Sequence, residues 1–310
     1  MGAAISARLI DSGCTVLTPL SGRSEASRAR AKAAGVQDVS LEDIINGHDV
    51  DWILSILPPN LAQSFAEDVT RVLYAKIADD AAKSAIPRIP VFVDCNAVNP
   101  KTAQFIARLF EPTSEHPSIP FIDASIIGGP PGENYDPTIY ASSDPSSLSE
   151  AFRDFGRSHG LKITTLTGEG TGVGSASALK MSYAGITKGL IGIFTTMVLS
   201  AHASSPGTMH ALVDELTHSQ ETIVRRMTRS LPDMLPKAYR FEGEMEEIAG
   251  FVGESDDTGM ADIYNGIAKT YAKVAKSVES QDTESGEEDG SAVSVLKDFV
   301  ERAIESLAEK

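Results

Sequence analysis

Cysteine is nearly absent from this sequence, because only Cys14 and Cys95 occur among its 310 residues. Two cysteines cannot build the disulfide framework of a small secreted protein, so the composition favours a reducing compartment, with the cytoplasm as the default expectation. The beginning of the chain has no charged segment followed by an apolar segment and a cleavage site, which argues against a secretory signal. No window approaches about eighteen uninterrupted apolar residues, so a membrane span is not expected.

Positive charge is also scarce. The 27 Lys and Arg residues are outnumbered by 43 Asp and Glu residues, which gives a formal net charge of −16. Such a surface repels phosphate backbones and argues against nucleic acid as the main partner, although a local basic pocket for a phosphorylated cofactor is compatible with it. The six histidines show no close metal-ligand spacing, so no metal site is expected.

The first half of the chain alternates short apolar runs with helical stretches. Runs dense in Val, Ile, Leu and Phe predict strands at 15–20, 51–57, 90–95 and 120–125, and further strands are expected at 137–142 and 162–167. Helices at 24–35 and 62–78 separate the first of these strands. The alternation predicts an α/β fold with a doubly wound, mostly parallel sheet.

After Gly174 the sequence becomes helical. From residue 176 to residue 201 only Lys180 and Lys188 are charged, which predicts one helix of about thirty residues, roughly 45 Å long and buried on most sides. The remaining sequence is also predicted to be helical, apart from an acidic linker at 281–291 before a terminal helix at 292–309. The chain therefore ends in an all-α domain.

Residues 1–13 predict a short helix that packs closely under a sheet, because Gly2 and several alanines alternate with apolar side chains. In dinucleotide-binding units such a helix follows a strand and a glycine-rich turn, and its N-terminus binds the pyrophosphate. Met1 and Gly2 would then lie at the cofactor phosphates. Taken alone, these two residues also fit an ordinary N-terminal helix.

Gly22, Arg23 and Ser24 follow the next predicted strand, where the second strand of a dinucleotide-binding unit ends. An acidic residue at this point binds the ribose 2′-hydroxyl, whereas an arginine accepts a 2′-phosphate. Arg23 therefore favours NADP, with NAD possible, and its alternative role is that of a solvated loop arginine.

Two more loops begin at the carboxyl ends of predicted strands, where ligands bind in folds of this kind. Leu57 and Pro58 open a loop stiffened by two prolines, and Asn96 brings an amide that can both donate and accept hydrogen bonds. Asn96 could equally be a turn-forming residue. Cys95 fits packing better than nucleophilic catalysis, because no histidine lies in a motif that would activate it.

The segment DASIIGGPPG, residues 123–132, is a more specific signal. Ser125 lies in a predicted buried strand, and the adjacent glycines Gly128 and Gly129 precede two prolines. This pattern predicts a rigid wall that the polar groups of a ligand can approach closely.

Lys180 stands in the apolar helix. A lysine on a helix is usually solvated, but the neighbours of Lys180 are apolar. Burial lowers the pKa of an ammonium group, so such a lysine can exchange a proton with a substrate hydroxyl near neutral pH. Tyr183, Thr187 and Lys188 follow at helical spacings of three and four along one side.

With these motifs in this order, residues 1 to about 275 resemble the β-hydroxyacid dehydrogenase superfamily, which includes 6-phosphogluconate and 3-hydroxyisobutyrate dehydrogenases. The resemblance is greatest to the 6-phosphogluconate dehydrogenase-like branch with a distinct C-terminal domain. Met1-Gly2 looks like the end of the family turn Gly-x-Gly-x-Met-Gly, so a first strand and two glycines are expected to be missing. An internal start codon or a misassigned gene start would explain this.

The resemblance implies a Rossmann-type NAD(P)-binding domain over 1–170 and a helical 6-phosphogluconate dehydrogenase-like domain over 171–310 that binds substrate and forms a homodimer. The segment GVGSASALKMSYAG is similar to the one that carries the catalytic lysine, which makes Lys180 the proton-transfer residue. IIGGPP is similar to the substrate-binding Ser-Gly-Gly segment, with Gly128 and Gly129 matching. Asn96 falls where the family places a side chain close to both nicotinamide and substrate, and the expected substrate site also includes Ser125, Tyr183 and Lys188.

Two departures affect the expected substrate. Ile127 replaces the family serine, and Tyr183-Ala184 replaces the His-Asn or Asn-Asn pair after the lysine. Both changes remove polar binding groups, so 6-phosphogluconate itself is not the expected substrate. The expectation is an NADP-dependent oxidoreductase acting on a small β-hydroxy acid or related carbonyl compound. The alternatives are a non-catalytic or cofactor-poor binding protein and an imine reductase-like enzyme, although Lys180 counts against the latter.

Overall fold

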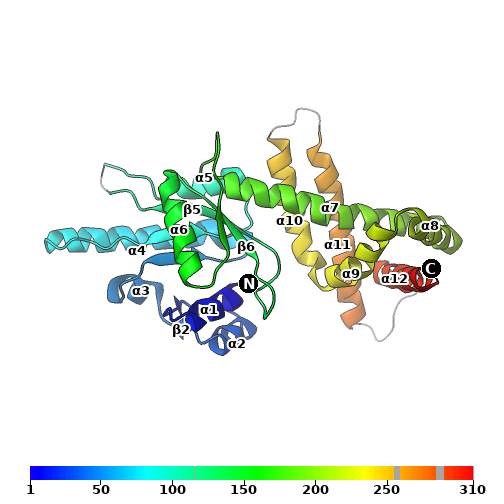
Figure 1. The fold of residues 1–310 in the computed structure, drawn as a ribbon, viewed down its shortest axis with the longest axis horizontal. Coiled ribbons are helices and arrows are strands. Elements are labelled where there is room, and N and C mark those ends of the chain that lie inside the picture. The colour runs from blue at the N-terminus through cyan, green and yellow to red at the C-terminus, as the bar shows by residue number, and fades with distance from the viewer. Residues whose placement is uncertain (115, 255–258, 284–289, 310) are drawn as a thin grey trace. The chain divides into compact units, whose positions relative to one another are not determined.

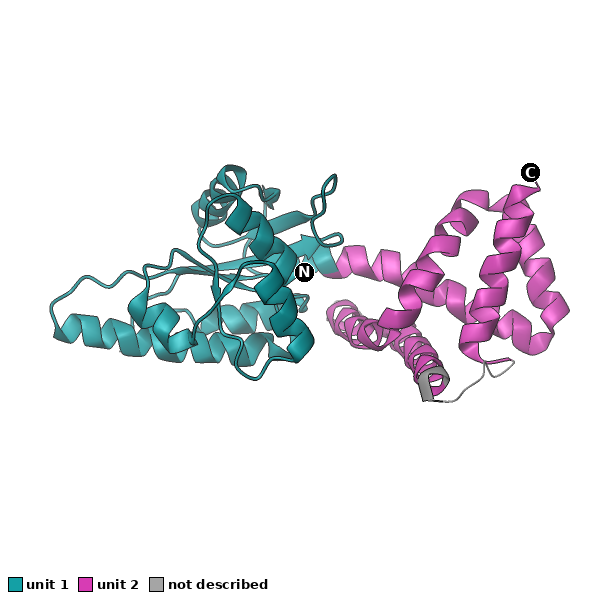
Figure 2. Ribbon diagram, turned by 90° about the horizontal axis from the view of Figure 1, so that it is seen from below, with its two compact units in different colours: residues 1–180 teal, residues 181–310 magenta. Residues whose placement is uncertain are grey.

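The computed structural model describes residues 1–114, 116–254, 259–283 and 290–309. These residues form two compact units, Met1–Lys180 and Met181–Lys310 (Figure 2). The boundary lies inside a long helix, ten residues after the expected boundary at 170/171. The first turn of this helix stays with the first unit because it is hydrogen-bonded to a strand there.

The first unit contains the α/β part of the chain (Figure 1). Its elements in chain order are α1 (Gly2–Asp11), β1 (Leu17–Thr18), α2 (Glu25–Ala33), β2 (Gln37–Asp38), α3 (Leu41–Gly47), β3 (Trp52–Ser55), the 3₁₀ turn η1 (Pro59–Leu61), α4 (Ala62–Ala82), β4 (Val91–Asp94), α5 (Pro100–Arg108), β5 (Phe121–Ile127), β6 (Thr138–Ser142), α6 (Ser146–Ser158) and β7 (Ile163–Thr165). Every predicted strand is confirmed in place, and β2, α3, α5 and α6 are additional.

Five strands form one sheet in the order β3-β4-β5-β6-β7, and β1 and β2 form a separate parallel pair. Within the larger sheet β3, β4 and β5 are parallel, β6 pairs antiparallel with β5, and β7 runs parallel to β6. In the described residues, β1 pairs only with β2 and β3 pairs only with β4, so no ladder joins the two sheets. The carboxyl ends of β3, β4 and β5 therefore lie at one edge, as in other open parallel sheets.

Both faces of the sheet are covered by helices, which confirms the doubly wound architecture. On one face, Phe92 and Phe121 pack with residues of α4 and α5 such as Val69 and Ile106. On the other face, strand residues pack with α1 and α6, for example through Phe152. Neighbouring strand residues fall into different clusters because side chains alternate across a strand.

The second unit is entirely helical in its described residues. The long helix α7 spans Ser175–Ser204 and is followed by α8 (Pro206–Ser219), α9 (Glu221–Met234), the 3₁₀ turn η2 (Leu235–Lys237), α10 (Ala238–Gly253), α11 (Ala261–Thr283) and α12 (Ala292–Ala308). Helix α11 extends into the expected linker at 281–291, of which 284–289 lie outside the described residues. The predicted thirty-residue helix is confirmed by α7.

The expectation that α7 is buried on most sides is wrong for the single chain. Ile186, Ile193 and Met197 are 71%, 50% and 53% exposed, although Gly185 and Gly192 pack against α11. By length and composition alone α7 could also cross a membrane, and its most apolar window is 33% buried. One such helix is weak evidence for a membrane, because core helices of globular proteins have the same composition.

Candidate active site

Asn96 fixes the loop after β3 from its position after β4. Its Oδ1 accepts a hydrogen bond from the backbone nitrogen of Leu57 at 2.6 Å, and its Nδ2 donates to Ser55 Oγ and to Asp94 Oδ1. Asn96 is only 2% exposed. In this structure the side chain therefore orients Leu57 and Pro58, and its direct contact with nicotinamide or substrate stays a prediction.

Asp94 is a buried carboxylate beside Asn96 that the sequence did not single out. Burial, and to a smaller extent the neighbouring Asp123 carboxylate, raise the pKa of Asp94, hydrogen bonds from Asn96 oppose them, and the resulting pKa is about 7. Asp94 Oδ2 has no hydrogen-bond partner among the described residues. The Asp94 carboxyl group therefore changes between its neutral and its charged form close to neutral pH.

The Gly128–Gly129 turn follows β5 directly and is exposed. Gly128 has a φ of +127°, and a Cβ atom there would overlap the phenol oxygen of Tyr135. The backbone nitrogen of Gly129 donates to Tyr135 Oη at 3.3 Å. Ser125, in contrast, is 1% exposed, and its Oγ has no partner among the described residues. The turn can thus meet a ligand directly, whereas a contact with Ser125 stays a prediction.

Lys180 lies at the end of the same strand. Its Nζ donates a 2.8 Å hydrogen bond to the backbone oxygen of Ile126, two residues before Gly128. The side chain is half-buried, and α7 approaches β5 with its first two turns. The structure therefore brings together the predicted proton-transfer lysine and the predicted glycine turn.

The N-terminus of α1 lies at the end of β3. Met1 is the N-cap residue and provides no side-chain hydrogen bond, and the first turn of α1 contains no acidic residue. A Cβ atom on Gly2 would be 3.9 Å from Ile56, so the helix start and the strand end are close. Backbone amides at a helix start, together with the positive end of the helix dipole, suit a phosphate group.

Arg23 occupies the turn between β1 and α2, where it was expected. Gly22 has a φ of +73°, and Ser24 caps α2 by accepting a hydrogen bond from Ser27. In the described residues no side chain accepts a hydrogen bond from the Arg23 guanidinium, whereas Arg28 donates to the Arg23 carbonyl oxygen. Arg23, Arg28, Arg30 and Lys32 lie within ten residues of the sequence and so form a basic cluster in a chain of net charge −16. Such a cluster suits a phosphate ligand.

Tyr183 and Lys188 belong to the second unit. Tyr183 is 50% exposed, whereas Lys188 forms an ion pair with Glu244 and lies 4.4 Å from the centre of the Phe241 ring. Lys188 therefore has a structural partner that the helical spacing did not indicate, because Glu244 lies 56 residues away. A contact of either residue with substrate stays a prediction.

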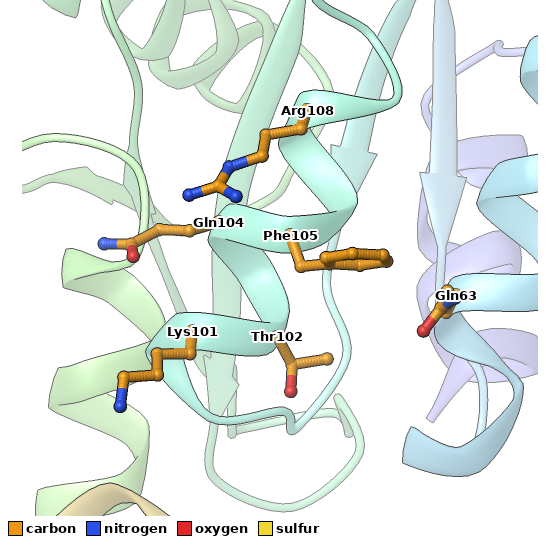
Figure 3. Close-up of a pocket in the computed structure, with 6 residues that line it drawn as sticks. All are labelled: Gln63, Lys101, Thr102, Gln104, Phe105 and Arg108. Carbon is orange, nitrogen blue, oxygen red and sulfur yellow. The ribbon is translucent and has the colours of Figure 1, made fainter. Parts of the chain in front are cut away.

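The structure has a pocket of about 500 Å³ on α5 and the start of α4 that contains none of the predicted site residues (Figure 3). In Figure 3, Lys101, Gln104 and Arg108 project from one side of α5 and Phe105 from another.

Burial raises the pKa of Cys95, which agrees with a packing role for this thiol. Among the described residues, no cluster of three His, Cys, Asp or Glu side chains is arranged to hold a metal.

Comparison with known proteins supports the fold described above. Residues 203–274 match a family described as a domain of unknown function (DUF1932). No curated protein is significantly similar in sequence. The conserved protein MTH1747, of unknown function and described as structurally similar to 3-hydroxyacid dehydrogenases, is 25% identical with a TM-score of 0.61, over 90% of this chain and 94% of that chain.

Two more distant structures share the fold. A conserved hypothetical protein from Sinorhizobium meliloti 1021 is 17% identical with a TM-score of 0.62, over 97% of this chain and 93% of that chain. A UDP-D-ManNAc dehydrogenase from Pyrococcus horikoshii is 12% identical with a TM-score of 0.53, over 97% and 79% of the two chains. The comparisons confirm the resemblance to hydroxyacid dehydrogenase-like proteins.

Proposed function

We propose that this protein is a nicotinamide-dependent oxidoreductase that acts on a small β-hydroxy acid or related carbonyl compound, with Lys180 as the general acid or base. The observation that carries the proposal is the hydrogen bond from Lys180 Nζ to Ile126 O at 2.8 Å. It holds an ammonium group at the carboxyl end of a parallel strand, beside an exposed glycine turn. Proton-transfer groups need this kind of fixed position within reach of a reacting hydroxyl.

The residues present fit a dinucleotide. The start of α1 at Met1 and Gly2 would hold its phosphates, and Leu57 and Pro58 would lie beside it. Arg23 would hold a 2′-phosphate, which is why we propose NADP as the preferred cofactor. When bound, the nicotinamide ring would accept or supply the hydride.

Lys180 performs the other half of the reaction. In oxidation its amine would take the proton of the substrate hydroxyl, and in reduction its ammonium would return a proton to the carbonyl oxygen. The hydrogen bond to Ile126 O fixes Nζ without neutralising its charge, because a carbonyl oxygen is a neutral acceptor. The exposed backbone of the Gly128–Gly129 turn would contact polar substrate atoms at the same strand end.

The test is turnover by Lys180→Met with a panel of β-hydroxy acids and their oxo counterparts. This substitution keeps a long apolar stem and removes the exchangeable proton. We expect NADPH binding and folding to persist while turnover falls about 10²- to 10⁴-fold, the range for loss of a general acid or base. Lys162→Met is the matched control, because Lys162 is exposed and has no proposed role.

Wild-type turnover by Lys180→Met would exclude the proton-transfer role. Absence of both turnover and nucleotide binding in the unaltered protein would favour a non-catalytic binding protein. Turnover of a cyclic imine, added to the same panel, without turnover of any hydroxy acid would favour an imine reductase-like enzyme.

A further inference from the structure

Asp123, in the middle of β5, caps α7 from a distance. Its Oδ2 accepts hydrogen bonds from the backbone nitrogens of Gly174, Ala176 and Ser177 at 2.9–3.1 Å. Oδ2 also accepts from Ser142 Oγ, and Oδ1 accepts from Ser177 Oγ at 2.7 Å. The carboxylate is 1% exposed, so water does not compete for these bonds.

In the described part of the chain, several helices are capped by the side chain directly before them, whereas α7 is not. Ser24, Ser40, Asn99 and Ser205 each cap the helix that follows them directly. The residue before α7 is Gly174, which has a φ of +100° and no side chain to act as a cap. Its cap comes from a strand 51 residues earlier, so satisfying the first amides of α7 also ties this helix to β5.

A buried carboxylate is a costly way to cap a helix. Burial raises the pKa of Asp123, which means that removal from water disfavours its charged form, and its hydrogen bonds offset this only in part. A serine or asparagine cap satisfies the same amides without a buried charge. The distinguishing property of Asp123 is that it joins α7 to one place on β5.

Lys180 is also hydrogen-bonded to β5, about one turn of α7 after Ser177. Ser177 and Lys180 are three residues apart on α7, and their partners Asp123 and Ile126 are three residues apart on β5. Three residues extend roughly 10 Å along the strand and about 4.5 Å along the helix. The extended lysine side chain covers the difference between these two lengths. With the first turn fixed at Asp123, the reach of Lys180 to Ile126 O is determined.

We propose that Asp123 is a positioning residue for Lys180, because it holds the first turn of α7 against β5 and so sets the place of the Lys180 ammonium. This inference rests on the proposed function, in which Lys180 transfers the proton. A cap that only stabilised the fold would affect melting temperature and leave the properties of Lys180 unchanged.

The experiment compares Asp123→Asn and Ser177→Ala with Ser40→Ala. Asp123→Asn keeps the shape and one acceptor while it removes the charge, and Ser177→Ala removes one donor to Oδ1 and keeps Asp123. Ser40→Ala removes the cap of α3 in the same unit and is the control for general destabilisation.

A misplacement of about 1 Å can lower turnover about 100-fold. We expect Asp123→Asn to lower kcat by about 10- to 100-fold and Ser177→Ala by less, with the KM for NADPH unchanged and kcat of Ser40→Ala at the wild-type value.

The second readout does not require activity. Lysine side chains are labelled by reductive ¹³C-methylation, and the Lys180 signal is assigned by its absence in Lys180→Met. We expect its titration midpoint to move by about half a pH unit or more in Asp123→Asn and in Ser177→Ala, and to stay constant in Ser40→Ala. If the unaltered protein has no turnover, the proposed function fails, and this titration still decides whether Asp123 positions Lys180.

A wild-type kcat together with a wild-type Lys180 titration in both variants overturns the positioning role. If Asp123→Asn does not fold, Ser177→Ala alone decides by the same two measurements. A lower melting temperature in either variant with both measurements unchanged also overturns it, because that is the result of a purely stabilising cap.

Discussion

The phenol oxygen of Tyr135 lies 3.3 Å from the backbone nitrogen of Gly129 and directly against Gly128. Tyr135 is held there because Gly132 donates a backbone hydrogen bond to its carbonyl oxygen at 2.8 Å. Arg8 of α1 in turn donates to the Gly132 oxygen. The turn proposed to bind substrate is therefore connected to the helix proposed to bind the cofactor.

Gly128→Ala tests the importance of this arrangement. An alanine at a φ of +127° is strained, by roughly 1–2 kcal/mol, and its Cβ atom must displace Tyr135. We expect a lower melting temperature and a KM for substrate raised about tenfold or more, with NADPH affinity unchanged. Gly132→Ala is the control in thermal melts and steady-state kinetics, because a Cβ atom there meets nothing within 4 Å. Equal behaviour of the two variants would contradict a special role for Gly128.

Arg23→Ala tests the cofactor preference. Only NADPH carries the 2′-phosphate, and a charge-assisted hydrogen bond contributes about 1.5–3 kcal/mol. We therefore expect NADPH binding to weaken about 10- to 100-fold and NADH binding to change little, as measured by fluorescence titration. Lys32→Ala removes one charge from the same basic cluster at an exposed position and should affect NADPH only slightly. Parallel losses for both nucleotides in Arg23→Ala would show that the arginine does not read the phosphate.

Asp94→Asn tests the buried carboxyl group at pH 4–8. The folded-state pKa of Asp94, about 7, is above the ordinary value of 3.8, so the folded protein binds the proton more tightly than the unfolded chain. The contribution of this group to stability is therefore fully present below pH 4 and is lost as pH rises through about 7, by up to ~4 kcal/mol. An asparagine side chain cannot titrate, so the stability of Asp94→Asn should not show this decrease with rising pH.

The measurement is the free energy of unfolding in urea at several pH values. A buried amide in place of Oδ2 can lower the stability of the variant at every pH, so the informative quantity is the difference between the two pH profiles. Asp11→Asn, at an exposed position, should follow the wild-type profile. Wild-type and Asp94→Asn profiles that run parallel from pH 4 to 8 would mean that Asp94 does not titrate in this range.

Long-range contacts are what the sequence could not reveal about the site. The extent of α7 was predictable because its thirty residues contain no proline and are mostly apolar from beginning to end. Strand β2 was missed because Gln37 and Asp38 are polar and exposed, and only their pairing with β1 makes them a strand.

The same limit applies to individual side chains. Lys180 and the Gly128–Gly129 segment were identifiable from local patterns. The role of Asp123 was not, because its partners lie 51–54 residues later in the chain and a carboxylate in an apolar strand has no distinctive spacing. Local patterns predict elements and reactive groups, whereas the orientation of those groups depends on contacts between distant segments.

The exposed apolar side chains of α7 lead to the last prediction, that the helical unit forms a homodimer. Ile186, Ile193 and Met197 lie at spacings of seven and four residues, so they share one side of the helix, and each is at least 50% exposed. Burial of such side chains contributes about 1.5–3 kcal/mol each, and an exposed apolar stripe of this kind is typical of an interface.

We expect the protein to sediment as a dimer at micromolar concentration. The double variant Ile186→Lys/Ile193→Lys should sediment as a folded monomer, with the affinity of dimerisation reduced by about 100-fold or more. Ile86→Lys is the matched control, since Ile86 is 97% exposed in the first unit and should leave the dimer intact. A wild-type protein that remains monomeric at high concentration, or a double variant that dimerises as before, would remove α7 from the interface.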